Sequence, residues 1–221
     1  MKREIITTAD GSTTIHLPDW NEQYHSKHGA IQEAYHVFIK QGLDLFDTQD
    51  VSLLEIGFGT GLNALITFLE SEKKALNVRY VGVEAYPVAM DEVSKLNYIE
   101  TLKANEHAAV FEQLHVQSWN ESHKITPLFS LEKRQQFFDQ ITDENQFDLI
   151  YFDAFGARVQ PELWTEDIFT RMYRALKAKG VLVTYSAKGS VRRAMQAVGF
   201  SVERLPGPPG KREMLRAIKE A

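Results

Sequence analysis

The chain has 221 residues, enough for one domain with its own core, and its lack of cysteine excludes disulfides, thiolate metal sites and a cysteine nucleophile. Its net charge is −5, yet residues 171–221 hold 12 Lys/Arg against 3 Asp/Glu, which leaves 13 against 27 for residues 1–170. This segregation predicts one basic face on an acidic body, or only charged helices near the C-terminus.

Residues 1–50 differ in pattern from the rest of the chain. Residues 5–17, with an Asp-Gly turn, predict a short β-hairpin, and residues 29–46 have apolar side chains at helical spacing. The four histidines here match no metal-ligand spacing, so we expect no metal. We expect an N-terminal extension packed on a main domain of residues 51–221. Because the chain shows neither a signal-peptide centre nor an apolar run of about 18 residues, we also expect a soluble, cytoplasmic protein with no membrane partner.

From residue 51 onward, strand and helix patterns alternate. Strands are predicted at 51–56, 79–85, 128–133, 147–153, 181–185, 200–204 and 213–218, and helices at 61–70, 87–98, 164–178 and 190–198. Short connections between them predict a parallel sheet with helices on both faces. The last two strands are joined only by a Pro/Gly loop and must pair antiparallel. This α/β pattern resembles the class I, Rossmann-like methyltransferases, with a mostly parallel seven-stranded sheet and one antiparallel strand.

The sharpest motif is Glu-x-Gly-x-Gly-x-Gly, which spans residues 55–61 between a strand and a helix. A dinucleotide-binding loop would need its third glycine at position 62, where this chain has leucine. The spacing is instead typical of the loop that lets S-adenosyl-L-methionine (SAM) approach the backbone; the alternative is a plain tight turn. The candidate cofactor contacts in this segment are Glu55, Gly57, Phe58, Gly59, Thr60, Gly61 and Asn63.

The second strand of the main domain ends at Glu84-Ala85. The carboxyl ends of neighbouring parallel strands meet over the same crevice, so a carboxylate there can accept hydrogen bonds from both ribose hydroxyls. An exposed Glu at a strand end is common and by itself indicates no ligand. Together with the glycine loop it indicates a cofactor contact. We therefore expect Glu84 and Ala85 at the cofactor.

The middle strand ends at Asp153-Ala154-Phe155. Many methyltransferases that act on planar base amines carry Asn/Asp-Pro-Pro-Tyr at this place, and the missing prolines favour a flexible aliphatic amine as acceptor. Such an amine must lose a proton before it can attack, and Asp153 could accept that proton. The alternative is that Asp153 only caps the following loop. Without cysteine the chain cannot use the covalent route to carbon 5 of a pyrimidine.

The Pro/Gly-rich loop before the last strand carries Lys211 and Arg212. If the preceding strand runs parallel to the others, this loop emerges at the carboxyl edge of the sheet. With Lys188, Arg192 and Arg193 it could then form a phosphate-binding rim. A rigid surface hairpin with solvated charges is the alternative.

Several segments together resemble one bacterial family. They are Asn21–Ser26 with Gly29, Ala30 and Glu33, Gly57–Asn63, Asp153–Phe155 with Pro161–Thr165, Ser190–Arg193, and Lys211–Met214. This combination resembles the methyltransferase domain of the enzymes that complete 5-methylaminomethyl-2-thiouridine at the tRNA wobble position. The resemblance implies methyl transfer from SAM to the aminomethyl nitrogen of uridine 34, with Asp153 at the reacting amine and the tRNA anticodon loop as partner. The candidate substrate contacts are Tyr24, Phe155, Arg192, Lys211 and Arg212.

The chain departs from its relatives in two ways. Many relatives carry a fused flavin-dependent oxidase, and its absence here predicts a stand-alone form, with functional coupling to the enzymes that install the aminomethyl precursor. Relatives also tend to carry an acidic residue after the third strand, near the adenine. The segment 133–138 reads Lys-Arg-Gln-Gln-Phe-Phe, so Gln135 or Gln136 would have to make that contact.

Two other functions remain open at this point. One is a small-molecule amine transferase of the polyamine aminopropyltransferase type, whose glycine loop usually carries an acidic residue where this chain has Thr60. The other is an inactive scaffold or RNA-binding module on the same fold, because a fold does not determine a function.

Overall fold

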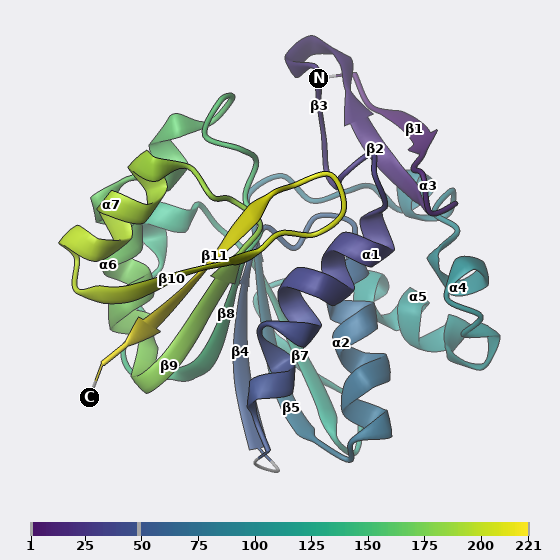
Figure 1. The fold of residues 1–221 in the computed structure, drawn as a ribbon. Helices are drawn as coiled ribbons and strands as arrows, with labels where there is room; N and C mark the ends of the chain where they lie inside the picture. The colour runs from purple at the N-terminus through teal and green to yellow at the C-terminus, as the bar shows by residue number, and fades with distance from the viewer. Residues whose placement is uncertain (1, 48–49, 221) are drawn as a thin grey trace.

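The computed structural model describes residues 2–47 and 50–220 and contains two sheets (Figure 1). The smaller sheet is formed by β1 (Glu4–Thr7), β2 (Thr13–Leu17) and β3 (Glu22–Gln23), paired in that order. The pairing of β1 with β2 is antiparallel, and the intervening Gly11 has a positive φ of 86°. The predicted N-terminal hairpin is therefore confirmed.

The larger sheet has eight strands in the order β10-β11-β9-β8-β4-β5-β7-β6. These strands are β4 (Asp50–Ile56), β5 (Asn77–Glu84), β6 (Ser122–Thr126), β7 (Phe129–Gln135), β8 (Phe147–Phe152), β9 (Leu176–Thr184), β10 (Phe200–Pro206) and β11 (Glu213–Lys219). Strands β7, β5, β4, β8 and β9 are parallel, and β11 runs antiparallel between β9 and β10. The mostly parallel α/β sheet is confirmed, with one strand more than the expected seven, because β6 adds antiparallel to the outer edge of β7.

Helices cover both faces of this sheet (Figure 1). One face carries α1 (Ala30–Ala34), which continues as a π-helix over Tyr35–Lys40, together with α2 (Leu62–Lys73) and α5 (Ala108–Val116). The other face carries α6 (Glu166–Ala175) and α7 (Gly189–Ala197). Short helices complete the chain: Pro18–Trp20, Leu43–Leu45, α3 (Met90–Val93), α4 (Tyr98–Thr101), Asn105–His107, Phe138–Gln140 and Pro161–Trp164.

The core has two layers because successive strand residues point to opposite faces. In β8, Leu149 and Tyr151 belong to the layer under α1 and α2, whereas Ile150 and Phe152 belong to the layer under α6. Residues of α1 and the π-helix are part of the first layer. The division of the chain at residue 50 stays a prediction.

Two local predictions are wrong, and long-range contacts explain both. The helix expected at 87–98 is broken into α3 and α4, because the Asn97 side chain accepts hydrogen bonds from Thr13 and donates one to Gly11 in the N-terminal hairpin. The helix expected at 164–178 ends at Ala175. Residues 176–178 instead begin β9, in which Lys179 has φ 64° and the pairing with β8 shifts register.

Residues 105–146, where the sequence predicted only the strand at 128–133, also contain helix α5 and the edge strand β6. Within residues 2–47 and 50–220, no helix combines the length and apolar character needed to span a bilayer.

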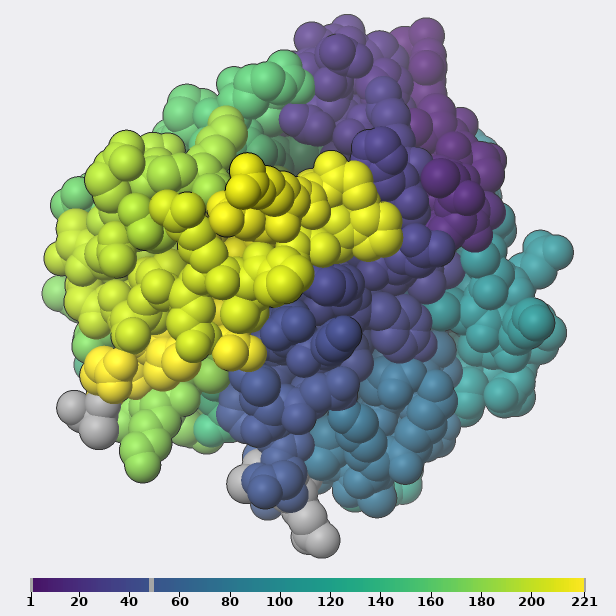
Figure 2. Space-filling view, viewed as in Figure 1, coloured from purple at the N-terminus to yellow at the C-terminus, as the bar shows by residue number. Residues whose placement is uncertain are grey.

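The carboxyl ends of β4, β5, β8 and β9 lie at one edge of the sheet, and the loop between β10 and β11 reaches the same edge. Figure 2 shows this loop, in yellow, against the dark blue-purple N-terminal residues.

Candidate active site

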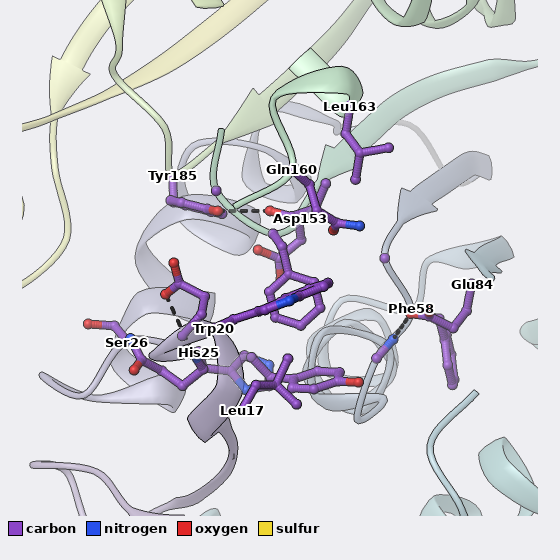
Figure 3. Close-up of a pocket in the computed structure, with 18 of the residues that line it drawn as sticks. Leu17, Trp20, His25, Ser26, Phe58, Glu84, Asp153, Gln160, Leu163 and Tyr185 are labelled. Carbon is purple, nitrogen blue, oxygen red and sulfur yellow. Dashed lines mark hydrogen bonds between the residues drawn. The ribbon is translucent and has the colours of Figure 1, made fainter. Parts of the chain in front are cut away.

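A cavity of about 1340 Å³ opens at this carboxyl edge of the sheet (Figure 3). Its lining comes from the glycine loop, the ends of β5 and β8, the N-terminal residues and the loop after β10. The crevice between β4 and β8 is the point where the strand order reverses, which is the usual ligand position in open α/β sheets. A pocket for a single small ligand measures roughly 300–1,000 Å³, so this one has room for two.

The glycine loop follows β4 and turns back tightly against β5. The backbone N–H groups of Gly57 and Phe58 both donate to the carbonyl oxygen of Val83, at 3.0 Å. Gly57 has φ 91°, and a Cβ atom on it would lie 2.7 Å from the carbonyl oxygen of Asp153. A Cβ on Gly59, with φ 50°, would lie 3.0 Å from the Tyr24 ring. Both positions need glycine, and the loop leaves bare backbone facing the cavity.

Glu84 ties the end of β5 to this loop. Its Oε2 accepts a hydrogen bond from the Gly59 N–H at 3.1 Å, and its Oε1 accepts one from the Tyr86 N–H at 3.0 Å. Glu84 and Ala85 both line the cavity, beside the loop residues Gly57 and Phe58. The carboxylate is therefore fixed by the backbone at the place where the sequence expects a ribose.

Asn63, in the first turn of α2, joins two carboxylates. Its Nδ2 donates to Oε1 of Glu55 at 2.9 Å and to Oδ2 of Asp153 at 2.8 Å. The other oxygen of Glu55 accepts a hydrogen bond from the Tyr80 hydroxyl at 2.8 Å, and burial raises the pKa of Glu55 well above its ordinary value. Glu55 is buried behind the loop, outside the cavity lining, and acts on the cavity through Asn63.

Asp153 stands at the end of β8, where its backbone N–H donates to the Ile56 carbonyl at 2.9 Å. Burial, reinforced by the nearby charge of Glu33, raises the pKa of Asp153 to about 7, although the Asn63 hydrogen bond and the Lys211 charge act in the opposite direction. A carboxyl group with this pKa can accept and return a proton at neutral pH. Figure 3 shows it near Tyr185, with Glu84 and Phe58 toward the other end of the cavity.

Three aromatic side chains form a wall of the cavity. The Phe155 ring meets the rings of Trp20 and Tyr24 edge to face, with centroid distances of 5.7 and 4.9 Å. Arg158 holds this wall in place, because its guanidinium donates to the backbone oxygens of Trp20 and Asn21. Burial raises the pKa of Tyr24 to about 12, so the ring is a neutral phenol. The wall suits a flat, uncharged ring such as a base.

The cavity also contains residues that the sequence did not single out as site residues. Glu33 and Tyr185 lie beside Asp153, and Trp20 belongs to the aromatic wall. Asp139 lines the cavity after β7, whereas Gln136 does not. The sequence predicted Gln135 or Gln136 near the adenine, whereas the acidic side chain that lines the cavity after β7 is Asp139, three positions beyond Gln136. A search of the loop one residue past Phe138 would have found it.

Six of the expected site residues lie outside the cavity lining: Glu55, Thr60, Gly61, Gln136, Arg192 and Arg212. The Thr60 hydroxyl accepts a hydrogen bond from Tyr98 in the protein interior, and Arg212 is exposed on the loop after β10. The contacts expected of these six residues stay predictions. No group of three or more His, Cys, Asp or Glu within the described parts of the chain could hold a metal ion.

Comparison with known proteins gives three results. Residues 108–220 match the family model described as S-adenosyl-L-methionine-dependent methyltransferase. The tRNA 5-methylaminomethyl-2-thiouridine biosynthesis bifunctional protein MnmC from Pseudomonas savastanoi pv. phaseolicola is 27% identical, over 90% of this chain and 32% of its own length. The protein of the same name from Hydrogenovibrio crunogenus is 26% identical, over 96% of this chain and 33% of its own length. The chain thus spans about a third of these relatives.

Solved structures agree with this result. MnmC2 from Aquifex aeolicus has a TM-score of 0.79 and 25% identity, covering 100% of this chain and 71% of that one. Spermidine synthase from Thermotoga maritima has a TM-score of 0.56 and 16% identity, covering 97% of this chain and 72% of that one, which shows a shared fold only. On the family match over more than half of its length, this chain belongs to the S-adenosyl-L-methionine-dependent methyltransferases.

Proposed function

We propose that this chain transfers a methyl group from SAM to the aminomethyl nitrogen of 5-aminomethyl-2-thiouridine at the wobble position of tRNA. The observation that carries the proposal is Asp153, a cavity carboxylate with a pKa of about 7 that is bound to Asn63 of the glycine-loop helix. The MnmC relatives are named for the biosynthesis of this nucleoside. The chain matches about a third of the length of those proteins.

The residues of the cavity fit SAM. Gly57 and Gly59 leave a backbone cradle that a Cβ would fill, and Glu84 presents a fixed carboxylate next to it for ribose hydroxyls. Asp139, after β7, lines the cavity and would accept a hydrogen bond from the adenine amino group, the contact that the sequence assigned to Gln135 or Gln136. When bound, SAM supplies a methyl carbon that its sulfonium makes electrophilic. The residues of the protein orient the acceptor amine and set its protonation state.

Asp153 prepares the nucleophile. An aliphatic amine has a pKa near that of lysine, roughly 10.4, so it arrives as an ammonium without a free electron pair. One N–H bond breaks, the proton moves to a carboxylate oxygen of Asp153, and the electron pair stays on nitrogen. The pKa of about 7 for Asp153 is nearer to the pKa of the amine than the pKa of an ordinary aspartate is, so the proton transfer costs less free energy.

The tRNA would approach over the basic edge of the protein. Lys188 and Arg193 at the start of α7 and Arg212 after β10 are exposed at this edge. Phosphate contacts from such residues position a nucleic acid without reading its sequence. The anticodon loop is the proposed partner in the cytoplasm, and the enzymes that install the aminomethyl group would act before this one.

The test uses labelled SAM and tRNA that carries 5-aminomethyl-2-thiouridine, with tRNA that carries 2-thiouridine as the control substrate. Label is expected only in the aminomethyl nucleoside after digestion. A protein that binds SAM by calorimetry but labels no aminomethyl tRNA would contradict the proposal. The polyamine-transferase alternative has fold-level likeness only, and it predicts a product from a small diamine and decarboxylated SAM instead.

A further inference from the structure

An ammonium group already occupies the part of the cavity next to Asp153. The Nζ of Lys211 forms an ion pair with the carboxylate of Glu33 and lies 3.9 Å from the centroid of the Tyr185 ring. The Glu33 side chain is only 8% exposed, whereas that of Lys211 is 30% exposed. Glu33, Tyr185 and Lys211 all line the cavity together with Asp153.

The carboxylate and the ring are held in place independently of the lysine. Oε1 of Glu33, in α1, accepts a hydrogen bond from the Ser26 N–H at 3.2 Å. The Tyr185 hydroxyl donates to the carbonyl oxygen of Ala154 at 2.8 Å, one residue from Asp153. A carboxylate and an aromatic face fixed around one point form a receptor for a compact cation.

Lys211 reaches this receptor from the Pro/Gly-rich loop between β10 and β11. The loop is fixed at its two ends, by the Gly207 N–H donating to the Arg212 carbonyl at 3.1 Å and by His36 Nε2 bonding to the Pro206 carbonyl at 2.8 Å. The lysine side chain is the long, jointed part, with four rotatable carbons between backbone and ammonium. Its head group can leave the receptor by rotamer changes without a change of fold.

We propose that Glu33 and the face of Tyr185 form the receptor for the substrate's aliphatic ammonium, and that Lys211 occupies this receptor until the substrate displaces it. The inference rests on the proposed function, because it takes a primary aliphatic amine as the acceptor. A buried carboxylate without a cation is costly, and the exchange replaces one ammonium by another so that Glu33 always has a partner.

The position of the receptor explains why the amine would react there. Glu33 and Lys211 both act on the pKa of Asp153, the first raising it and the second lowering it, so the receptor lies within electrostatic reach of that carboxylate. A nucleoside without the amine cannot displace Lys211. The receptor therefore selects aminomethyluridine over unmodified uridine, since a site built for a polar group discriminates strongly against an analogue that lacks it.

The test compares the affinity of the protein for two anticodon stem-loops, one with 5-aminomethyl-2-thiouridine and one with 2-thiouridine at the wobble position. S-adenosyl-L-homocysteine is present, so no transfer occurs. The measured quantity is the ratio of the two affinities. Glu33→Gln, which keeps the acceptor for Ser26, should lower the ratio by roughly tenfold or more, the loss expected of a charge-assisted hydrogen bond. Tyr185→Leu should lower it by roughly three- to tenfold, and Tyr185→Phe should lower it less, because it keeps the ring face.

The Lys211→Met variant decides the question by the direction in which the affinity ratio changes. The ratio should rise by roughly tenfold, because the substrate's ammonium meets no competitor and pairs with an otherwise unpaired carboxylate. A ratio that falls or stays constant would make Lys211 a fixed counter-ion and overturn the proposal. The neighbouring Arg212→Ala is the matched control and should weaken both stem-loops equally.

A measurement without tRNA separates this proposal from the proposed function. Methylammonium chloride should bind the Lys211→Met protein in calorimetry and should bind neither the wild type nor the Glu33→Gln/Lys211→Met double variant. Binding of this pattern in a protein that methylates no tRNA would support the ammonium receptor and contradict the proposed tRNA substrate. Methylation of aminomethyl tRNA by a protein whose Lys211→Met variant does not bind methylammonium would support the tRNA substrate and contradict the ammonium receptor.

Discussion

The two ends of the cavity are built in different ways. The proposed cofactor end consists of the loop at residues 57–61, which follows β4, and Glu84, which ends β5. Backbone N–H groups of the loop donate to the Val83 carbonyl and to the Glu84 carboxylate. The proposed amine end joins Glu33, Asp153, Tyr185 and Lys211, which come from four distant parts of the chain. The first end depends on local backbone geometry, and the second depends on charges that only the folded chain brings together. Substitutions at the two ends should therefore fail differently.

The largest difference is expected at Asp153. Asp153→Asn keeps the size of the side chain and removes the proton acceptor, so kcat should fall by about 10²–10⁴-fold while the affinity for SAM stays within a small factor. Rapid-quench single turnover measures the first quantity and calorimetry the second. Equal losses in both would mean that Asp153 belongs to the cofactor end.

Glu84→Ala should show the opposite behaviour. Loss of hydrogen bonds to a charged acceptor should weaken SAM binding by roughly 10- to 100-fold. Single-turnover rates at saturating SAM should change little, because Glu84 lies away from the reacting amine. Glu84→Gln is the matched control and should recover part of the affinity. A variant with normal affinity and slow turnover would break the comparison.

The pH dependence tests the electrostatics of the amine end. Asp153 must be ionised to accept a proton, so kcat/KM should fall as the pH drops below about 7, the pKa of this carboxyl group. Removing the Lys211 charge raises that pKa and should move the acidic limb of the profile to higher pH, whereas Glu33→Gln lowers that pKa and should move the limb to lower pH. Profiles of the three proteins measure these shifts. A limb that stays in place in both variants would show that neither charge reaches Asp153.

The smallest effect is expected at the surface. Arg212→Ala should reduce the slope of log affinity against log salt by about 0.7–0.9, the value for one phosphate contact. Lys211→Met should leave the slope for tRNA without the aminomethyl group unchanged, because its ammonium is paired with Glu33 in that complex. Binding curves at several salt concentrations decide whether Lys211 pairs with Glu33 or contacts a phosphate. A reduced slope for Lys211→Met would favour the phosphate contact that the sequence suggested.

The strands and the glycine loop could be predicted because their signals are local. The strand that ends at Ile56, the loop glycines and helix α2 lie within one short stretch, and the loop geometry requires glycine at Gly57 whatever surrounds it. The antiparallel pairing of β10 and β11 also followed from the short connection between them. The helix expected at 87–98 failed because Asn97 bonds to a hairpin more than eighty residues away.

The sequence by itself determined the α/β architecture and the crevice at the carboxyl edge, and it indicated Asp153 as the candidate carboxylate there, because periodicity and strand ends depend on neighbouring residues. Only the tertiary structure decided that Glu55 lies behind the loop, that Asp139 lines the cavity where Gln136 does not, and that Lys211 meets Glu33 over Tyr185. Burial and charge pairing are sums over contacts between segments distant in the chain, and no local pattern of residues contains them.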